Sequence, residues 1–139
     1  MKRISYLFLF FAAFLLTSFA SEEELVPWQS VSITSPEMPV VGAIVVQAST
    51  QNETYQKLEV TAFGRVHALT ANDLKQLDGF PLSSLLLTHE AGYVQLGGHT
   101  VYLKFRRSFY NKAKKLVRES VMISIPENAA LTVSERNTH

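Results

Sequence analysis

The chain of 139 residues contains no cysteine, and its 13 basic and 12 acidic residues nearly balance, with a net charge of +1. The absence of cysteine excludes a disulfide scaffold, a thiolate metal site and a catalytic thiol. The balance of charge argues against a chain that attracts nucleic acid through its overall charge.

The first 20 residues have the pattern of a secretory signal peptide. Lys2 and Arg3 precede an apolar run over residues 4–17, and Ser18-Phe19-Ala20 places small residues at the −3 and −1 positions of a cleavage site. An uncleaved membrane anchor is the alternative, although the apolar run is short for a spanning helix. Cleavage leaves 119 residues with eleven basic and twelve acidic side chains, a net charge of −1. We therefore expect a secreted or periplasmic bacterial protein.

Proline placement divides the rest of the chain. We expect an extended, proline-containing arm over residues 21–41, a single globular β-rich domain over residues 42–134 and a tail over residues 135–139. Alternation over residues 29–34 predicts a short edge strand within the arm, because proline cannot donate to a central ladder. Trp28, the only tryptophan, is expected to pack onto the domain.

Two apolar stretches predict strands early in the domain. Residues 42–48 form a continuous apolar run rich in β-branched side chains, which favours a strand covered on both faces. Residues 57–69 alternate, and their shared apolar side begins with Leu58, Val60 and Ala62. Val66 and Ala68 continue that side unless Gly64 forms a bulge that shifts the phase.

The clearest helix signal covers residues 70–77. Thr70 is a good N-cap, Asp73 places a negative charge in the first turn, and Gly79 follows as a stop signal. The next apolar run, residues 82–88, favours a buried strand over a helix.

Residues 93–105 are two alternating runs joined by Gly97-Gly98, which predicts a β-hairpin with a type I′ turn. A two-residue turn places Val94 opposite Val101. The side expected to face the core contains Val94, Leu96, Val101, Leu103 and Phe105. The side expected to face outward contains Tyr93, Gln95, Thr100, Tyr102 and Lys104.

After this hairpin, apolar residues at helical spacing predict a second helix over residues 106–118, with a long basic loop as the alternative. A strand over residues 120–125, a turn at residues 126–128 and a last strand over residues 130–134 follow. The predicted fold class is α+β, a mainly antiparallel β-sheet with one or two short helices after the signal peptide. A small, partly open barrel is the alternative arrangement.

Basic residues concentrate after the predicted hairpin. Seven of the eleven basic residues that follow the signal peptide lie within residues 104–118, with no acidic residue among them. Tyr102, Phe109 and Tyr110 are interleaved with this basic segment, as aromatic side chains are in surfaces that bind anionic polymers. The alternative is a solvated face that keeps the domain soluble. The candidate binding residues are Tyr102, Lys104, Arg106, Arg107, Tyr110, Lys112, Lys114 and Lys115.

Signals for catalysis are weak. His67, His89 and His99 are zinc-ligand types, but their spacing matches no metal motif, and His89 and Glu90 point to opposite faces of a strand. The serines have no nucleophile elbow around them, and no glycine-rich phosphate loop occurs. We assign no catalytic residue, metal ligand or cofactor.

The sequence therefore predicts an exported, non-catalytic binding or accessory module of the bacterial envelope. Its expected partner is an anionic polymer, a lipid head group or an acidic protein surface, contacted through the hairpin and the basic segment. Membrane contact is expected only through the signal segment. The alternatives are a small metal-dependent hydrolase that uses the three histidines, and a structural subunit that assembles through a strand edge.

Overall fold

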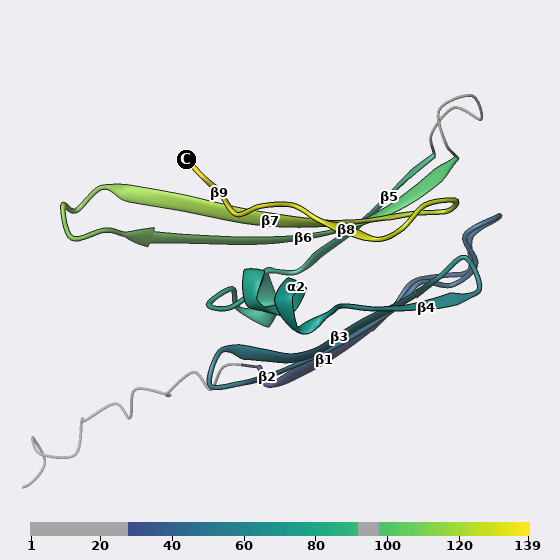
Figure 1. The fold of residues 1–139 in the computed structure, drawn as a ribbon, viewed down its shortest axis with the longest axis horizontal. Helices are drawn as coiled ribbons and strands as arrows, with labels where there is room; N and C mark the ends of the chain where they lie inside the picture. Colours follow the sequence, from purple (N-terminus) through teal and green to yellow (C-terminus); the bar gives the residue numbers. More distant parts are fainter. Residues whose placement is uncertain (1–27, 92–97) are drawn as a thin grey trace, which may run out of the picture.

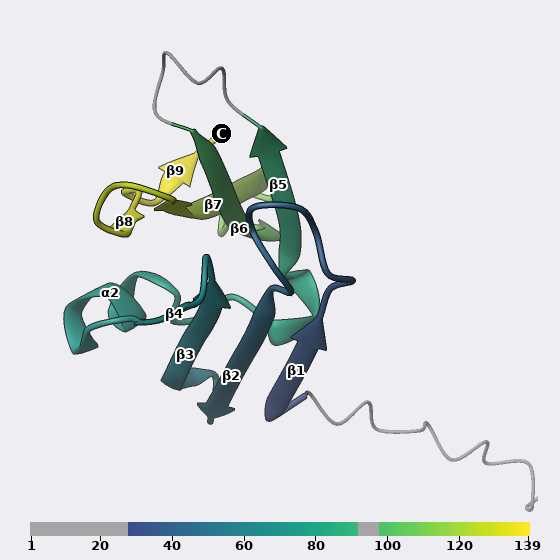
Figure 2. The ribbon, with the colours of Figure 1, turned by 90° about the vertical axis from the view of Figure 1, so that its right-hand side faces the viewer.

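Two antiparallel β-sheets stack face to face in the computed structural model, which describes residues 28–91 and 98–139 (Figure 1). Within the described residues, the first sheet has four strands and the second has five. Figure 2 shows one sheet above the other, with the helix at one side. The described strands form no closed barrel. The chain is thus mainly antiparallel β-sheet with few helices.

The first sheet is a meander of four strands. They are β1 (Ser30–Thr34), β2 (Val45–Gln51), β3 (Thr54–Ala62) and β4 (Arg65–Ala68). The predicted edge strand is confirmed, because β1 pairs only with β2 among these strands. The predicted inner side of β3 is also confirmed, since its apolar residues from Leu58 to Ala62 are buried.

Strand β2 is covered on one face, so the prediction that both of its faces are buried is wrong. Val46 and Ala48 are buried, whereas Gln47 between them is exposed. Only the inner face of the first sheet packs against the second sheet. The apolar run therefore includes residues, such as Val45, whose side chains point away from the core.

The connection between β3 and β4 is a hairpin turn, not a bulge. Phe63 and Gly64 both have positive φ, at 54° and 68°, as a two-residue type I′ turn requires. Such a turn pairs Ala62 with Arg65 and shifts the alternation by one residue. Val66 is therefore 65% exposed instead of joining the core side.

The connection between the sheets contains helix α2 (Ala71–Gln76) and the 3₁₀ turn η1 (Leu82–Ser84). Thr70 Oγ1 accepts a hydrogen bond from Asp73 N, and Asp73 Oδ2 accepts one from Thr70 N. This capping box confirms the predicted helix start. The buried strand predicted over residues 82–88 is only partly right, because η1 occupies its first residues.

The second sheet contains the longest strands. They are β5 (Leu86–Ala91), β6 (His99–Tyr110), β7 (Leu116–Pro126), β8 (Thr132–Val133) and β9 (Asn137–Thr138). Val101, Leu103 and Phe105 of β6 are buried, so the predicted inner side of this strand is confirmed. The residues expected to form a tail contain β9, which pairs with β7.

The predicted hairpin register is wrong. Val101 pairs with His89 of β5 on one edge and with Ile125 of β7 on the other. Both edges of β6 are thus occupied at Val101, and Val94 cannot lie opposite it. The predicted partner strand and Gly97 lie in residues 92–97, which are outside the described residues.

The predicted helix over residues 106–118 is also wrong, and the basic-loop alternative covers only the turn at its centre. Strand β6 continues to Tyr110, and β7 begins at Leu116. Eleven successive residue pairs join the two strands, from Thr100–Pro126 to Tyr110–Leu116. This long ladder satisfies the backbone polar groups along both strands, which outweighs the weak helical spacing of the apolar residues.

The core lies between the inner faces of the two sheets and continues under the connection. Phe80 and Leu77 of the connection are fully buried. The strands contribute Val46, Ala48, Leu58, Val60 and Ala62 from the first sheet and Val101, Leu103, Phe105, Val121, Ile123 and Ile125 from the second.

Candidate functional site

The predicted binding residues divide between the two faces and the turn of the β6–β7 hairpin. Because Leu103 and Phe105 point into the core, alternation places their neighbours on the outer face. The outer-face members of the predicted set are Tyr102, Lys104, Arg106 and Tyr110. Lys112, Lys114 and Lys115 lie in the turn, and Arg107 lies on the inner side.

Arg118 of β7 joins the cations on the outer face. It pairs with Ser108, while Arg106 pairs with Ser120, so the two arginines are diagonal neighbours separated by serines. A shallow hollow of about 240 Å³ lies beside them. Its lining contains basic, acidic and hydroxyl groups, from Lys104, Arg106, Arg107, Ser108, Arg118, Glu119, Ser120 and His139. Among the ion pairs found in residues 28–91 and 98–139, only Arg107–Glu119 involves the basic segment.

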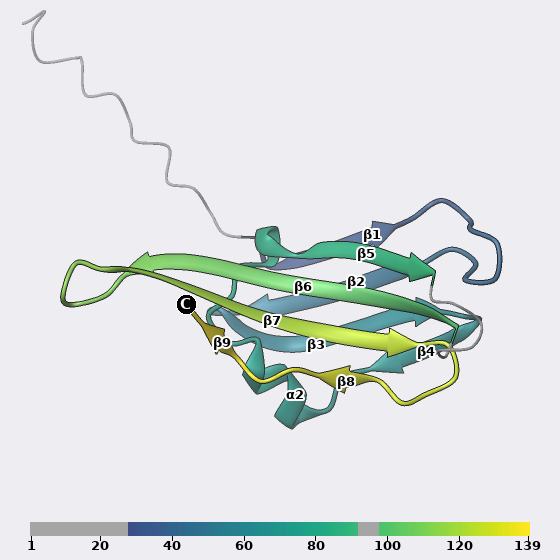
Figure 3. The same ribbon diagram turned by 90° about the horizontal axis from the view of Figure 1, so that it is seen from above.

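The turn of this hairpin presents three exposed lysines. Asn111 Oδ1 accepts hydrogen bonds from the backbone N–H groups of Ala113 and Lys115, both at 3.0 Å, and Lys114 has a positive φ of 58°. These bonds give the turn a defined shape. Figures 1 and 3 show the turn extending beyond the end of the first sheet.

Exposed apolar groups lie next to these cations. Tyr110 is 73% exposed and pairs with Leu116, which is 45% exposed, at the end of the ladder. Tyr102 is half-buried on the same face, opposite Ser124. The outer face of the hairpin therefore combines cationic groups with exposed tyrosine and leucine side chains.

Arg107 is bound within the fold. Its Nε donates to Glu119 Oε2 at 2.6 Å, and its Nη1 donates to the Gly79 carbonyl at 2.9 Å. The guanidinium also lies over the rings of Phe80 and Phe109, 5.1 and 5.2 Å from their centroids. These contacts leave Arg107 little freedom to bind a partner.

Arg136 completes this internal cluster and was not singled out by the sequence. Its guanidinium lies 5.1 Å from the Phe80 centroid, and Nη2 donates to the carbonyls of Gln76 and Asp78 at 3.0 and 2.8 Å. Because both acceptors are backbone carbonyls of a distant segment, no side-chain pattern in the sequence could have indicated them.

Two of the three histidines that were considered as zinc ligands lie in contact. His89 Nε2 and His99 Nδ1 are 3.0 Å apart, and the rings stack with an interplanar angle of 6°. His89 and Glu90 face opposite sides of β5, as predicted. His67 belongs to β4 in the other sheet. Within the described part of the chain, no three histidine or acidic side chains are grouped as metal ligands.

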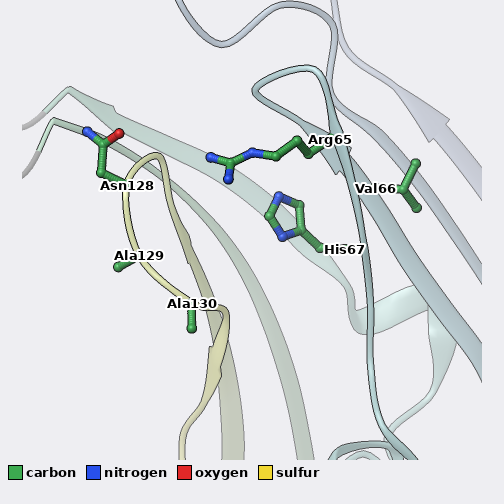
Figure 4. A pocket seen from close by; sticks show the side chains of 6 residues that line it. All are labelled: Arg65, Val66, His67, Asn128, Ala129 and Ala130. Carbon is green, nitrogen blue, oxygen red and sulfur yellow. The ribbon is translucent and has the colours of Figure 1, made fainter.

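His67 lines a polar pocket between the edges of the two sheets. The pocket has a volume of about 590 Å³ and lies between β4 and residues 128–130. Figure 4 shows Arg65 and His67 pointing toward that loop and Val66 pointing away. Arg65 Nη2 donates to the Glu127 carbonyl, which links the sheets, and His67 Nε2 is buried without a hydrogen-bond partner in the described structure.

Comparison with known proteins gives no relative. No protein-family model, curated protein or solved structure matches this chain. No helix within residues 28–91 and 98–139 is long and apolar enough to cross a membrane. Function is therefore inferred from the surfaces of the molecule.

Proposed function

We propose that this chain is an exported, non-catalytic binding module that contacts an anionic partner through the β6–β7 hairpin. The observation that supports the proposal most directly is the distribution of cations on one projecting hairpin. Its outer face and turn present Lys104, Arg106, Lys112, Lys114, Lys115 and Arg118, and none of these forms an ion pair with a described residue.

Binding would depend on electrostatic attraction followed by close packing. The hairpin creates a local positive field, although the chain after the signal peptide has a net charge of −1. Arg106 and Arg118 offer planar donor groups suited to carboxylate, sulfate or phosphate. Tyr110 supplies an exposed aromatic face beside them. Export to the periplasm or medium, proposed from the first 20 residues, would bring this surface to envelope polymers.

Heparin is a suitable probe of such a surface, because it is a soluble polyanion. We expect heparin binding at low salt, and replacement of Lys112 and Lys114 by glutamate should weaken it about 30-fold or more, since each cation near a polyanion contributes about 1 kcal/mol. Titration calorimetry at several salt concentrations measures the affinity. Affinity should fall steeply as salt rises.

The matched control replaces Lys57 and Lys75, which lie outside the hairpin, by glutamate. This control changes the net charge by the same amount, so it separates a local site from overall charge. Equal losses in the two double variants, or an affinity that does not change between low and high salt, would contradict the proposed surface.

A further inference from the structure

A second surface, the groove beside Trp28, has a different chemistry from the basic hairpin. Its volume is about 530 Å³, and none of its lining residues lines the hollow on the hairpin. The β2–β3 turn forms one wall and the segment around η1 forms another. Trp28 and Gln29, which precede β1, also line it.

The sequence predicted that Trp28 packs onto the domain. Its side chain is instead largely exposed to solvent. Trp28 is 60% exposed, although its backbone is tied to the end of β2. Thr50 Oγ1 donates to the Trp28 carbonyl at 3.4 Å, and Thr50 N donates to the Gln29 carbonyl at 2.8 Å. An exposed indole with an anchored backbone beside a groove is typical of a ligand contact, because the ring offers a large apolar face at low entropic cost.

The β2–β3 turn holds a strained residue at this groove. Asn52 and Glu53 have positive φ values of 50° and 61° in a two-residue hairpin turn. Asparagine accepts this conformation readily, but the second position favours glycine, so glutamate there is unfavourable. The Glu53 carbonyl accepts a hydrogen bond from Gly79 N at 3.3 Å, which ties the strained turn to the opposite wall.

The combination of groups indicates the ligand. The groove has one exposed aromatic ring, that of Trp28, and its polar groups are the amides of Gln29 and Asn52, the hydroxyls of Thr50 and Ser83 and the Glu53 carboxylate. Phe80, Pro81 and Leu82 add apolar lining. A pyranose ring has an apolar face of C–H groups and a rim of hydroxyls that match this set. No basic side chain lines the groove, which disfavours an acidic sugar.

We propose that the groove beside Trp28 binds an uncharged saccharide of one or two sugar units. Trp28 would stack on the apolar face of a sugar ring, and Glu53 and Asn52 would accept and donate hydrogen bonds at its hydroxyls. The volume lies in the range of small-ligand pockets. The inference does not depend on the anionic partner of the hairpin, because the two sites share no lining residue.

Trp28 provides the readout, because it is the only tryptophan in the chain. The full chain is titrated with glucose, cellobiose and N,N′-diacetylchitobiose. Tryptophan is excited selectively, and its fluorescence emission is measured at each sugar concentration. We expect a saturable change in emission with at least one probe, at a dissociation constant of about 1 mM, the weak range expected of an open groove. Salt should have little effect on this binding.

Two variants test the assignment, with saturation-transfer NMR of the sugar as the second readout. Trp28→Ala should weaken binding about tenfold or more. Glu53→Gly should also weaken binding about tenfold, yet raise the melting temperature by about 4 °C because it relieves the positive φ. A purely structural role for Glu53 would not combine these two effects.

The matched control is Tyr110→Ala, which removes an exposed aromatic ring from the hairpin. It should leave saccharide binding unchanged and weaken heparin binding, whereas Trp28→Ala should do the reverse. Absence of a saturable change with all three sugars at concentrations well above 1 mM would overturn the inference. Binding that persists in both Trp28→Ala and Glu53→Gly would also overturn it.

Discussion

Tyr55 is the residue at which the first sheet, the connection and the second sheet meet. Its hydroxyl donates to the Phe80 carbonyl at 2.8 Å, and its ring contacts Phe105 edge to face, with centroids 5.7 Å apart. Its backbone N–H donates to Asp78 Oδ1 at 3.1 Å. Burial raises the pKa of the Tyr55 phenol above its ordinary value, and the negative charge of the nearby Asp78 carboxylate raises it further.

Stability should therefore fall in alkaline solution. Above about pH 10 the unfolded chain releases the Tyr55 proton while the folded chain retains it, so the free energy of unfolding decreases as pH rises. Tyr55→Phe should cost about 1 kcal/mol at pH 7 and flatten this alkaline decrease. Urea unfolding between pH 7 and pH 11 measures both effects, with Tyr102→Phe as control. An identical alkaline slope in wild type and Tyr55→Phe would contradict the assignment.

Among the elements, the β6–β7 hairpin carries different groups on its two faces. The outer face holds the cations proposed for binding. On the inner side, Arg107 lies directly opposite Glu119, with the Nη2–Oε2 distance at 2.6 Å and only 26% and 12% of the two side chains exposed. This pair anchors the projecting half of the hairpin to Phe80 and Gly79 of the connection.

Glu119→Gln should destabilise the fold by about 2 kcal/mol, because it leaves the poorly solvated Arg107 guanidinium without its counter-charge. Glu59→Gln is the matched control, since its partner Lys57 is 49% exposed and a surface pair contributes less than about 1 kcal/mol. Chemical denaturation of both variants measures the difference. If Glu119→Gln costs no more than Glu59→Gln, the anchoring role is wrong.

At the scale of the whole molecule, the last five residues connect parts that are distant in sequence. β9 pairs with β7, and the backbone of His139 exchanges two hydrogen bonds with that of Arg118. Arg136 reaches from this segment to the carbonyl of Gln76, the last residue of α2, to the carbonyl of Asp78 and to the ring of Phe80. The segment thus links the second sheet to the connection between the sheets.

A chain that ends at Ser134 should lose about 3 kcal/mol of unfolding free energy, from the charged hydrogen bonds and the cation–π contact of Arg136. Arg136→Ala in the full-length chain should reproduce most of this loss. Urea unfolding monitored by circular dichroism provides the measurement. A change within about 0.5 kcal/mol for the shortened chain would show that these residues are dispensable.

For strand β6, sequence patterns predicted which side faces the core but not which strands pair with it. Alternation identified the inner side of Val101, Leu103 and Phe105 because burial of one sheet face imposes a period of two. The same pattern could not identify the partner strand, since the residues on either side of Gly97-Gly98 also alternate. The apolar residues within 106–118 are spaced as in a helix, yet the segment forms strands, because strand pairing is a long-range interaction that local spacing does not record.

The candidate sites were predictable to different degrees. The cluster of cations is a property of composition, so the sequence indicated it directly. Which cations share a face depended on the register of β6 against β7, which separated Arg107 from Arg106. The groove at Trp28 was not predicted, because it forms only where the β2–β3 turn meets the segment around η1.

Local sequence patterns were sufficient to predict the β-rich class, the start of α2, the apolar sides of β3 and β6, and the local excess of positive charge. These features depend on residues that are close together in the sequence, because periodicity, helix capping and local charge can all be recognised from short segments. Tertiary structure alone decided the partners of β6, the internal role of Arg107 and the exposure of Trp28. Each of these depends on which distant segments pack together, and packing is settled by the free energy of the whole fold.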